Sequence, residues 1–240
     1  MKKPFSKLFF GRFALFLCST MVFGLTGCLN DDVDDNPAPT PVAYVSFYHG
    51  SPDAPDLNVI VDDEKINSQA FKYSNASSYL SLTTGNHEIG FTSVTAADVL
   101  VDTTFDFKEG KIYSMFTADS LQSMDLLVVE DSLIVPGSGK AGLRLINLSP
   151  DAPALDISIA GGGATPVFSN IASKGSTRFL PVTDGTHSFV VKEAGTENVL
   201  VPATSLSIEP GRNYTLVVRG FQTPPSGNTN ALALQIIRNY

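Results

Sequence analysis

The sequence predicts an all-β protein built from two similar antiparallel β-sandwich domains in tandem. From residue 42 onward, short runs of alternating apolar and polar residues are interrupted by Gly, Pro, Asn and Asp about every ten residues, which is typical of strands joined by turns. No stretch of ten or more residues in this part of the chain shows the periodicity of a helix. The pentapeptide Ser-Pro-Asp-Ala-Pro occurs at 51–55 and again at 149–153, each time between two alternating runs.

The first 27 residues have the parts of a secretory signal in the expected order. Three lysines near the start are followed by an apolar run from Phe13 to Phe23 and then by small residues. The apolar run is too short to span a bilayer comfortably. Residues 1–27 are therefore predicted to be a signal peptide that is removed from the mature protein.

Leu25-Thr26-Gly27-Cys28 ends this segment and resembles the lipobox of bacterial lipoproteins. The resemblance implies cleavage between Gly27 and Cys28, a diacylglyceryl group on the Cys28 thiol, and palmitate as a further lipid. Several acyl chains on one residue give stable membrane anchoring. The expected location is the bacterial outer membrane, facing the cell surface or the periplasm. The alternative is an ordinary signal peptide with an incidental cysteine.

Residues 28–41 are predicted to be a flexible tether. The stretch 29–36 is acidic and repels itself, and 37–41 is rich in proline, which favours extended geometry. At about 3.3 Å per residue, the tether could hold the folded part roughly 40 Å from the lipid. The acidic stretch lacks the glycine turn and distal glutamate of an EF-hand, and loosely resembles the surface-export signals of Bacteroidetes lipoproteins.

Charge and cysteine usage exclude several classes of protein. Removal of residues 1–27 takes away four basic residues and no acidic one, so the formal net charge falls from -8 to -12. Such an acidic protein has no electrostatic footprint for nucleic acid. Cys18 leaves with the signal and Cys28 carries lipid, so no disulfide or cysteine metal site is expected.

Residues 42–135 form the first predicted sandwich and 141–240 the second. Thr84-Gly85-Asn86-His87 matches Asp184-Gly185-Thr186-His187 at an offset of 100, while the pentapeptides are 98 residues apart. Blocks that keep their spacing, with slack only between them, indicate two copies of one domain. The runs read as strands in the first copy are 44–48, 57–61, 87–91, 99–107, 112–116 and 124–129, and those beside the second pentapeptide are 143–147 and 155–159.

The segment 136–140 is a short Pro- and Gly-rich linker, which predicts that the sandwiches lie end to end with limited flexing. Each copy has the size and strand spacing of an immunoglobulin-like sandwich, although the Cys–Trp–Cys signature is absent. The two pentapeptides, each followed by an Asp- or Asn-bearing strand and then Gly-x-His, resemble domain-of-unknown-function family 4397. The resemblance covers 43–131 and 142–238. It implies immunoglobulin-like sandwiches in secreted or lipid-anchored bacterial proteins, and no activity.

The repeated pentapeptide has two possible roles. Its prolines restrict the backbone, and its Ser and Asp side chains can bond neighbouring amides, so it can serve as a rigid corner between two strands. Alternatively, the two corners could present polar side chains to a ligand or cation. The candidate ligand-binding residues are Ser51, Asp53, Asp56, Ser149, Asp151 and Asp156.

The three histidines are weaker candidates for a site. His87 and His187 share strand parity with apolar residues, so both are predicted to point inward at the edge of a core. His49 could be half of a metal site with Asp53 and Asp56, but Asn147 replaces it in the second copy. No metal ligand set and no cofactor are predicted.

No catalytic motif is present. The chain lacks Gly-x-Ser-x-Gly and His-Glu-x-x-His, and 137–140 lacks most of a phosphate loop. The loop 221–231 is longer than its counterpart in the first copy, and is either a binding surface or a neutral insertion. The predicted function is a non-catalytic binding or spacer module that contacts surface protein or glycan. The alternatives are a hydrolase or glycan-related hydrolase accessory, and a structural component of an envelope assembly.

Overall fold

The computed structural model describes residues 40–96, 98–162 and 165–239. The predicted signal peptide, its cleavage site at Gly27, the lipidation site at Cys28 and the tether up to residue 39 lie outside the described residues. The described part is all-β, with sixteen strands and one 3-10 turn, Leu121–Ser123. It contains no helix that is long and apolar enough to cross a membrane.

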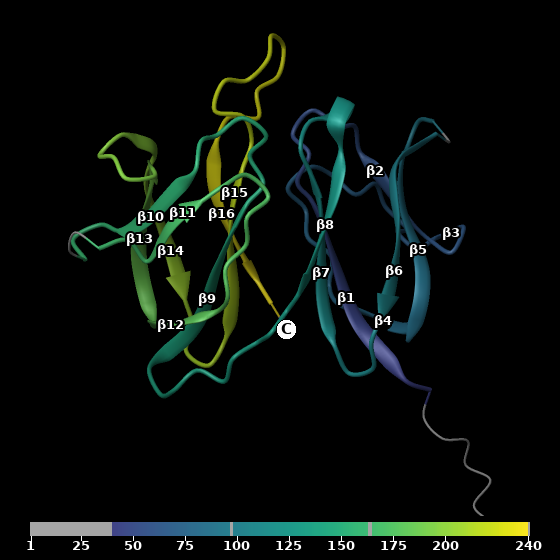
Figure 1. The fold of residues 1–240 in the computed structure, drawn as a ribbon, viewed down its shortest axis with the longest axis horizontal. Coiled ribbons are helices and arrows are strands. Elements are labelled where there is room, and N and C mark those ends of the chain that lie inside the picture. The colour runs from purple at the N-terminus through teal and green to yellow at the C-terminus, as the bar shows by residue number, and fades with distance from the viewer. Residues whose placement is uncertain (1–39, 97, 163–164, 240) are drawn as a thin grey trace, which may run out of the picture. The chain divides into compact units, whose positions relative to one another are not determined.

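The first sandwich has two sheets. The sheet that faces the other sandwich, here called the inner sheet, has the order β4-β1-β7-β8, and the outer sheet has the order β3-β2-β5-β6 (Figure 1). Period-2 alternation places Val45 and Phe47 of β1 in the core between these sheets, opposite Ile89 and Phe91 of the outer sheet. Its strands are β1 Val42–His49, β2 Leu57–Val61, β3 Glu64–Lys65, β4 Leu80–Thr83, β5 Gly85–Ser93, β6 Val99–Phe107, β7 Ile112–Ala118 and β8 Asp125–Glu130.

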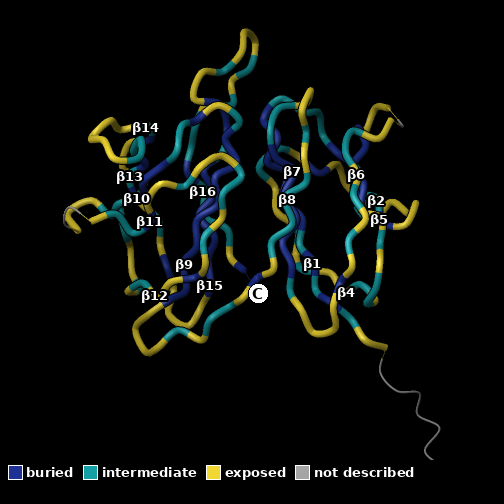
Figure 2. The backbone as a smooth tube through the Cα atoms, viewed as in Figure 1, coloured by how far each residue is buried: buried dark blue, intermediate teal, exposed yellow. Residues whose placement is uncertain are grey.

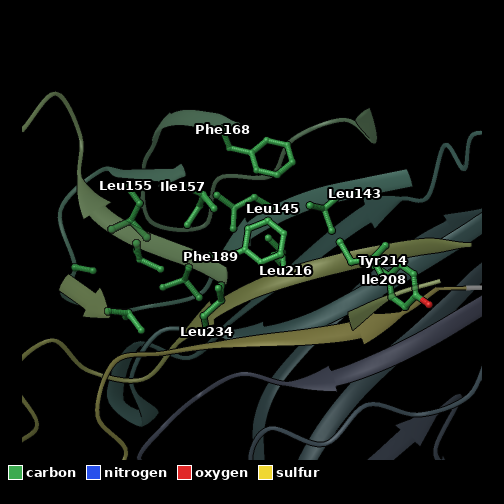
Figure 3. Packing of buried hydrophobic residues seen from close by; sticks show 14 of the residues in the cluster. Leu143, Leu145, Leu155, Ile157, Phe168, Phe189, Ile208, Tyr214, Leu216 and Leu234 are labelled. Atoms are coloured by element: carbon green, nitrogen blue, oxygen red, sulfur yellow. The ribbon is translucent and has the colours of Figure 1, made fainter. Parts of the chain in front are cut away.

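The second sandwich repeats this arrangement, with an inner sheet β12-β9-β15-β16 and an outer sheet β11-β10-β13-β14. Figure 3 shows its core, where Leu145, Phe189 and Leu216 pack between the two sheets. Its strands are β9 Lys140–Asn147, β10 Leu155–Ile159, β11 Phe168–Ile171, β12 Leu180–Thr183, β13 Gly185–Glu193, β14 Val199–Ile208, β15 Asn213–Arg219 and β16 Ala233–Arg238.

The prediction of two tandem β-sandwiches is confirmed, with one difference in strand direction. β1 pairs with β7 in parallel, and β9 pairs with β15 in parallel, whereas the other strand pairs are antiparallel. Parallel neighbours need a long crossover connection. In each copy the chain leaves the inner sheet at the pentapeptide and forms two strands of the outer sheet. It then adds one short strand, β4 or β12, to the edge of the inner sheet, forms two more outer strands, and returns to lie beside its first strand. Hairpin signals alone do not reveal that return.

The prediction that the sandwiches lie end to end is wrong. Residues 40–240 form one compact unit, and the inner sheets of the two sandwiches pack face to face (Figure 1). β7, β9 and β15 are therefore buried on both faces, with almost unbroken runs of buried residues (Figure 2). On these strands one set of alternate residues enters a sandwich core, and the other set enters the contact between the sandwiches.

The connection between the copies is held against the second sandwich. The Asn213 side chain donates to the carbonyl oxygen of Ile134 at 2.9 Å and accepts from its amide at 3.4 Å. A Cβ atom added to Gly142 would lie 2.0 Å from Asn213 Oδ1 and 2.9 Å from Ile134. Gly142 therefore makes room for this connection, and the segment before the predicted linker is not a free hinge.

Candidate functional site

Both pentapeptides form corners that join an inner sheet to an outer sheet. Ser51 Oγ donates to the carbonyl oxygen of Ala118 at 3.1 Å, and Ser149 Oγ donates to that of Gly220 at 2.7 Å. Both serines are fully buried. Each hydroxyl thus fixes its corner to the end of the strand that pairs with the first strand of its copy.

The aspartates of the pentapeptides bind the loop that follows the same strand. Asp53 Oδ1 accepts a hydrogen bond from the amide of Leu121 at 2.7 Å. Asp151 accepts two, from the amide of Gln222 at 2.7 Å on Oδ1 and from that of Thr223 at 2.9 Å on Oδ2. The carboxylates therefore satisfy backbone donors that no strand partner takes up.

The aspartates just after the pentapeptides differ between the copies. Asp156 is buried and accepts from the amides of Asn170 at 2.7 Å and Gly195 at 3.0 Å, which ties β11 and the turn after β13 to the start of β10. In the first copy, the backbone oxygen of Asp56 accepts from the amide of Val94 at 3.0 Å. The structure places the candidate residues in two separate corners. Ligand binding by these corners stays a prediction.

The long loop between β15 and β16 reaches the corner of the other sandwich. The side-chain amides of Asn228 and Asn230 both donate to the carbonyl oxygen of Pro52, at 3.1 and 2.6 Å. In Figure 1 this loop is the yellow segment that projects beyond β15 and β16. The lengthening of the loop in the second copy therefore supplies a contact with the first pentapeptide.

His87 and His187 lie at the edges of the two cores, as predicted. His87 Nε2 lies 2.9 Å from the carbonyl oxygen of Thr83, and its ring packs against Phe107. His187 repeats the contact to its own upstream turn. In the first copy only, Nδ1 lies 2.5 Å from Asp62, whose pKa is lowered mainly by the amide of Glu88 and also by this histidine.

His49 is fully buried and is held by groups of its own copy. Nε2 lies 3.0 Å from the carbonyl oxygen of Pro55, and Nδ1 lies 3.3 Å from Thr117 Oγ1. Burial lowers the pKa of His49, and the bond to Pro55 offsets part of that effect. The described residues contain no group of three or more His, Cys, Asp or Glu side chains that could hold a metal ion.

The buried imidazole predicts that stability falls in mild acid. The unfolded chain takes up a proton near pH 6.5, while the folded chain resists it because the pKa of His49 is lowered. The contribution is complete above pH 6.5 and is lost as the pH falls below that value. We expect the difference in unfolding midpoint between pH 8 and pH 5 to shrink in His49→Asn, which copies the second sandwich. An unchanged difference would assign the effect to other groups.

The most extensive polar cluster lies between the two inner sheets, where sequence reasoning placed no site. Arg144 of β9 is 1% exposed, and its Nη1 lies 2.6 Å from Asp131 Oδ1, just after β8 of the first sandwich. The same guanidinium donates to Thr215 Oγ1 at 2.7 Å and Ser114 Oγ at 3.3 Å, and its Cζ lies 4.8 Å from the centre of the Phe179 ring.

The other carboxylate oxygen of Asp131 completes the cluster. It accepts from Ser114 Oγ at 2.6 Å and from the Tyr79 hydroxyl at 2.5 Å. Asn239 connects Tyr79 to Thr215, since its side-chain amide donates to the Tyr79 hydroxyl at 2.9 Å and its side-chain oxygen accepts from Thr215 at 2.7 Å. Burial and the charge of Asp131 raise the pKa of Tyr79, so its hydroxyl keeps its proton and donates.

Apolar side chains lie next to this polar cluster, further along the same strands. They form one buried group drawn from both sandwiches, in which Tyr48 and Phe116 of the first meet Ile146 and Val217 of the second. The Tyr48 hydroxyl donates to Gln235 Oε1 across the contact at 2.9 Å. At the edge, Lys174 of the second sandwich lies 3.0 Å from the Asp125 carboxylate of the first. The inner faces therefore form a packed core with an apolar part and a polar part.

Two of the surface hollows of the first sandwich are candidate ligand sites. One of about 360 Å³ lies in the first sandwich, and none of its lining residues is Asp, Glu or His. Beside it, the side chain of Asn67 bonds the amide of Val59 and the carbonyl oxygen of Leu57, so it takes up part of the free edge of β2. A smaller hollow of about 190 Å³ on the outer sheet is lined by Asp63, Glu88 and Asp102 among others.

The fold and the contact between the inner sheets define a tandem β-sandwich protein. Residues 43–158 match the family model described as "Domain of unknown function (DUF4397)", the family that the sequence resembles. The matched range covers the first sandwich and continues through β9 into β10. For the rest of the second copy, the predicted relation rests on the repeated topology.

Among solved structures, the Bacillus anthracis TIE protein is similar to this chain with 12% sequence identity and a TM-score of 0.25. The similarity covers 75% of this chain and 34% of that chain, so this chain spans about a third of the length of that protein. No curated protein matches the sequence.

Proposed function

We propose that this is a lipid-anchored envelope or cell-surface protein whose two sandwiches act together as a non-catalytic binding or spacer module. The observation that carries the proposal is the face-to-face packing of the inner sheets around Arg144 and Asp131. Such packing makes one rigid body rather than two jointed domains. A rigid body at the end of a tether suits presentation of loops away from a membrane.

The lipid anchor is tested at Cys28. We expect Cys28→Ser to move the protein from the membrane fraction to the soluble fraction, because serine has no thiol to accept the diacylglyceryl group. Cys18→Ser provides the matched control, since Cys18 lies within the predicted signal peptide and should leave fractionation unchanged. Membrane retention of the Cys28→Ser protein would contradict the anchor.

Binding is tested with the soluble chain 29–240, which contains no cysteine. We expect capture of a surface protein in a pull-down from envelope extract, or retention of specific glycans on an array. The loop 221–231 is hydrogen-bonded to both corners, at Asp151 and at Pro52. Replacement of 223–229 by a short turn should therefore weaken that capture. Equal capture by the shortened chain would move the binding surface elsewhere.

A hydrolase or hydrolase accessory is the second candidate, and the hollow lined by Asp63, Glu88 and Asp102 is the observation that favours it. Its volume is below the several hundred Å³ typical of a small-molecule site. Release of product from glycan or ester substrates by the soluble chain, abolished in Glu88→Gln, would favour this candidate.

A structural role in an envelope assembly needs a sheet edge that can accept another strand. β6 and β14 end their outer sheets. Pro202 lies within β14 and has no amide hydrogen to donate, and β6 carries Asp102 and Asp106. Both features discourage pairing at these two edges.

A further inference from the structure

The polar cluster between the inner sheets is built from pairs of equivalent positions in the two copies. Ser46 lies opposite Ser114 in the β1–β7 pair, and Arg144 lies opposite Thr215 in the β9–β15 pair. The hydrogen bond from Arg144 Nε to Thr215 in the second copy corresponds to that between Ser46 Oγ and Ser114 Oγ, 3.1 Å apart, in the first.

The same correspondence holds for the acidic half of the cluster. The amide of Asp131 donates to the carbonyl oxygen of Ile112 at 2.7 Å, and the amide of Asn239 donates to that of Asn213 at 2.9 Å. Asp131 is thus the counterpart of Asn239. Ser114 donates to Asp131 as Thr215 donates to Asn239.

The charges break this internal symmetry. The first copy supplies a buried anion, Asp131, and has the neutral Ser46 where the second copy has Arg144. The second copy supplies the buried cation and has the neutral Asn239 in place of the acid. Each copy therefore carries one buried charge that has no oppositely charged partner at the equivalent position of its own copy, and the charges of the two copies are opposite.

We propose that the Arg144–Asp131 pair selects the partner of each inner face, so that the first sandwich accepts the second and rejects another copy of itself. Two first sandwiches packed by their inner faces would bury two carboxylates that meet serine instead of arginine. Two second sandwiches would bury two guanidinium groups that meet asparagine. A buried charge without its partner is strongly unfavourable, whereas the mixed pair satisfies both charges.

This selection matters because the apolar parts of the two faces are alike. Tyr48 and Ile146 are equivalent, as are Phe116 and Val217, and all four are fully buried in the contact. Apolar contacts of this kind are non-directional and would also hold two identical faces together. Anchored copies concentrated on one membrane would meet each other often, and the charge pair directs each inner face to its own chain's partner.

The test cuts the linker between the sandwiches, so that each half can pair with a like or an unlike half. A protease site is placed in 136–139 of the soluble chain 29–240, and the folded protein is cut, unfolded in denaturant and refolded. Native mass spectrometry then counts complexes of unlike and like halves. We expect unlike pairs to exceed like pairs at least ~tenfold in the wild type, and unlike pairs to fall to about half of all complexes in Asp131→Asn with Arg144→Ser.

A transposed variant keeps both charges but places the cation in the first sandwich and the anion in the second. Ser46→Arg, Asp131→Asn, Arg144→Ser and Asn239→Asp together should restore the preference for unlike halves, because the new pair joins the equivalent positions. Like pairs in the cut wild type, or cut halves that do not associate, would overturn the proposal. It would also be overturned if the neutral double variant kept the wild-type preference. If that variant does not refold, the wild-type and transposed proteins still decide the question.

Discussion

Asp131→Ala will lower the free energy of unfolding of the soluble chain by about 3–5 kcal/mol, because it leaves Arg144 buried without a carboxylate. The side chain of Arg144 is 1% exposed and that of Asp131 is 0% exposed, so water cannot replace the lost partner. Urea unfolding followed by circular dichroism measures the change. The loss should appear in the unfolding of both sandwiches, since the charge pair joins them.

Asp125→Ala is the matched control for this prediction. Asp125 also pairs with a cation of the second sandwich, Lys174, but its side chain is 54% exposed and that of Lys174 is 40% exposed. An exposed pair contributes at most about 1 kcal/mol. Losses of similar size in Asp125→Ala and Asp131→Ala would mean that the position of a charge in the contact, rather than its burial, decides its effect.

Phe116→Ala will cost about 3–5 kcal/mol in the same assay, as is typical when a fully buried phenylalanine is truncated and a cavity remains. Phe116 lies on the face of β7 that points away from its own sandwich core, with its ring 5.8 Å from that of Tyr48. In an isolated first sandwich this face would meet water, and truncation would cost little.

Val135→Ala is the control for that substitution, because Val135 is 98% exposed and its truncation should change the unfolding free energy by less than about 0.5 kcal/mol. A loss in Phe116→Ala no larger than that of this control would show that the inner faces do not stay packed in solution.

The strands and their grouping into two copies could be predicted from the sequence because each signal is local. Alternation in 57–61 corresponds to β2, which has one face in a core and one partly exposed, and alternation in 87–91 corresponds to the first half of β5. The turns between them carry Gly, Asn and Asp. The repeated pentapeptide set the register of the copies, and the structure shows it at the same corner in both.

The contact between the sandwiches could not be predicted, because part of it is polar. Ser46, Ser114 and Thr215 alternate with core residues, so they read as the solvent face of ordinary strands, and Arg144 reads as an exposed cation. Only their mutual hydrogen bonds allow them to be buried. Local signals were the apolar runs 145–146 beside Arg144 and 216–218 beside Thr215, which are longer than a half-exposed strand requires.

The candidate residues of the pentapeptides were easier to place than to interpret. Ser51 and Ser149 were chosen because they are polar and recur, and the structure shows both bound to backbone carbonyl oxygens. Asp151 likewise uses both carboxylate oxygens on backbone amides. Sequence alone cannot separate such a polar corner from a ligand site, because both need the same residue types in a constrained turn.

The packing of the inner faces predicts that the two sandwiches unfold as one cooperative unit. Hydrogen exchange measured by mass spectrometry across a denaturant series tests it directly, with peptides from β5 reporting on the first core and peptides from β13 on the second. We predict that both sets lose protection at the same denaturant concentration, and that Asp131→Ala shifts them together. Separate transitions for the two sets, with only one shifted by Asp131→Ala, would contradict this prediction.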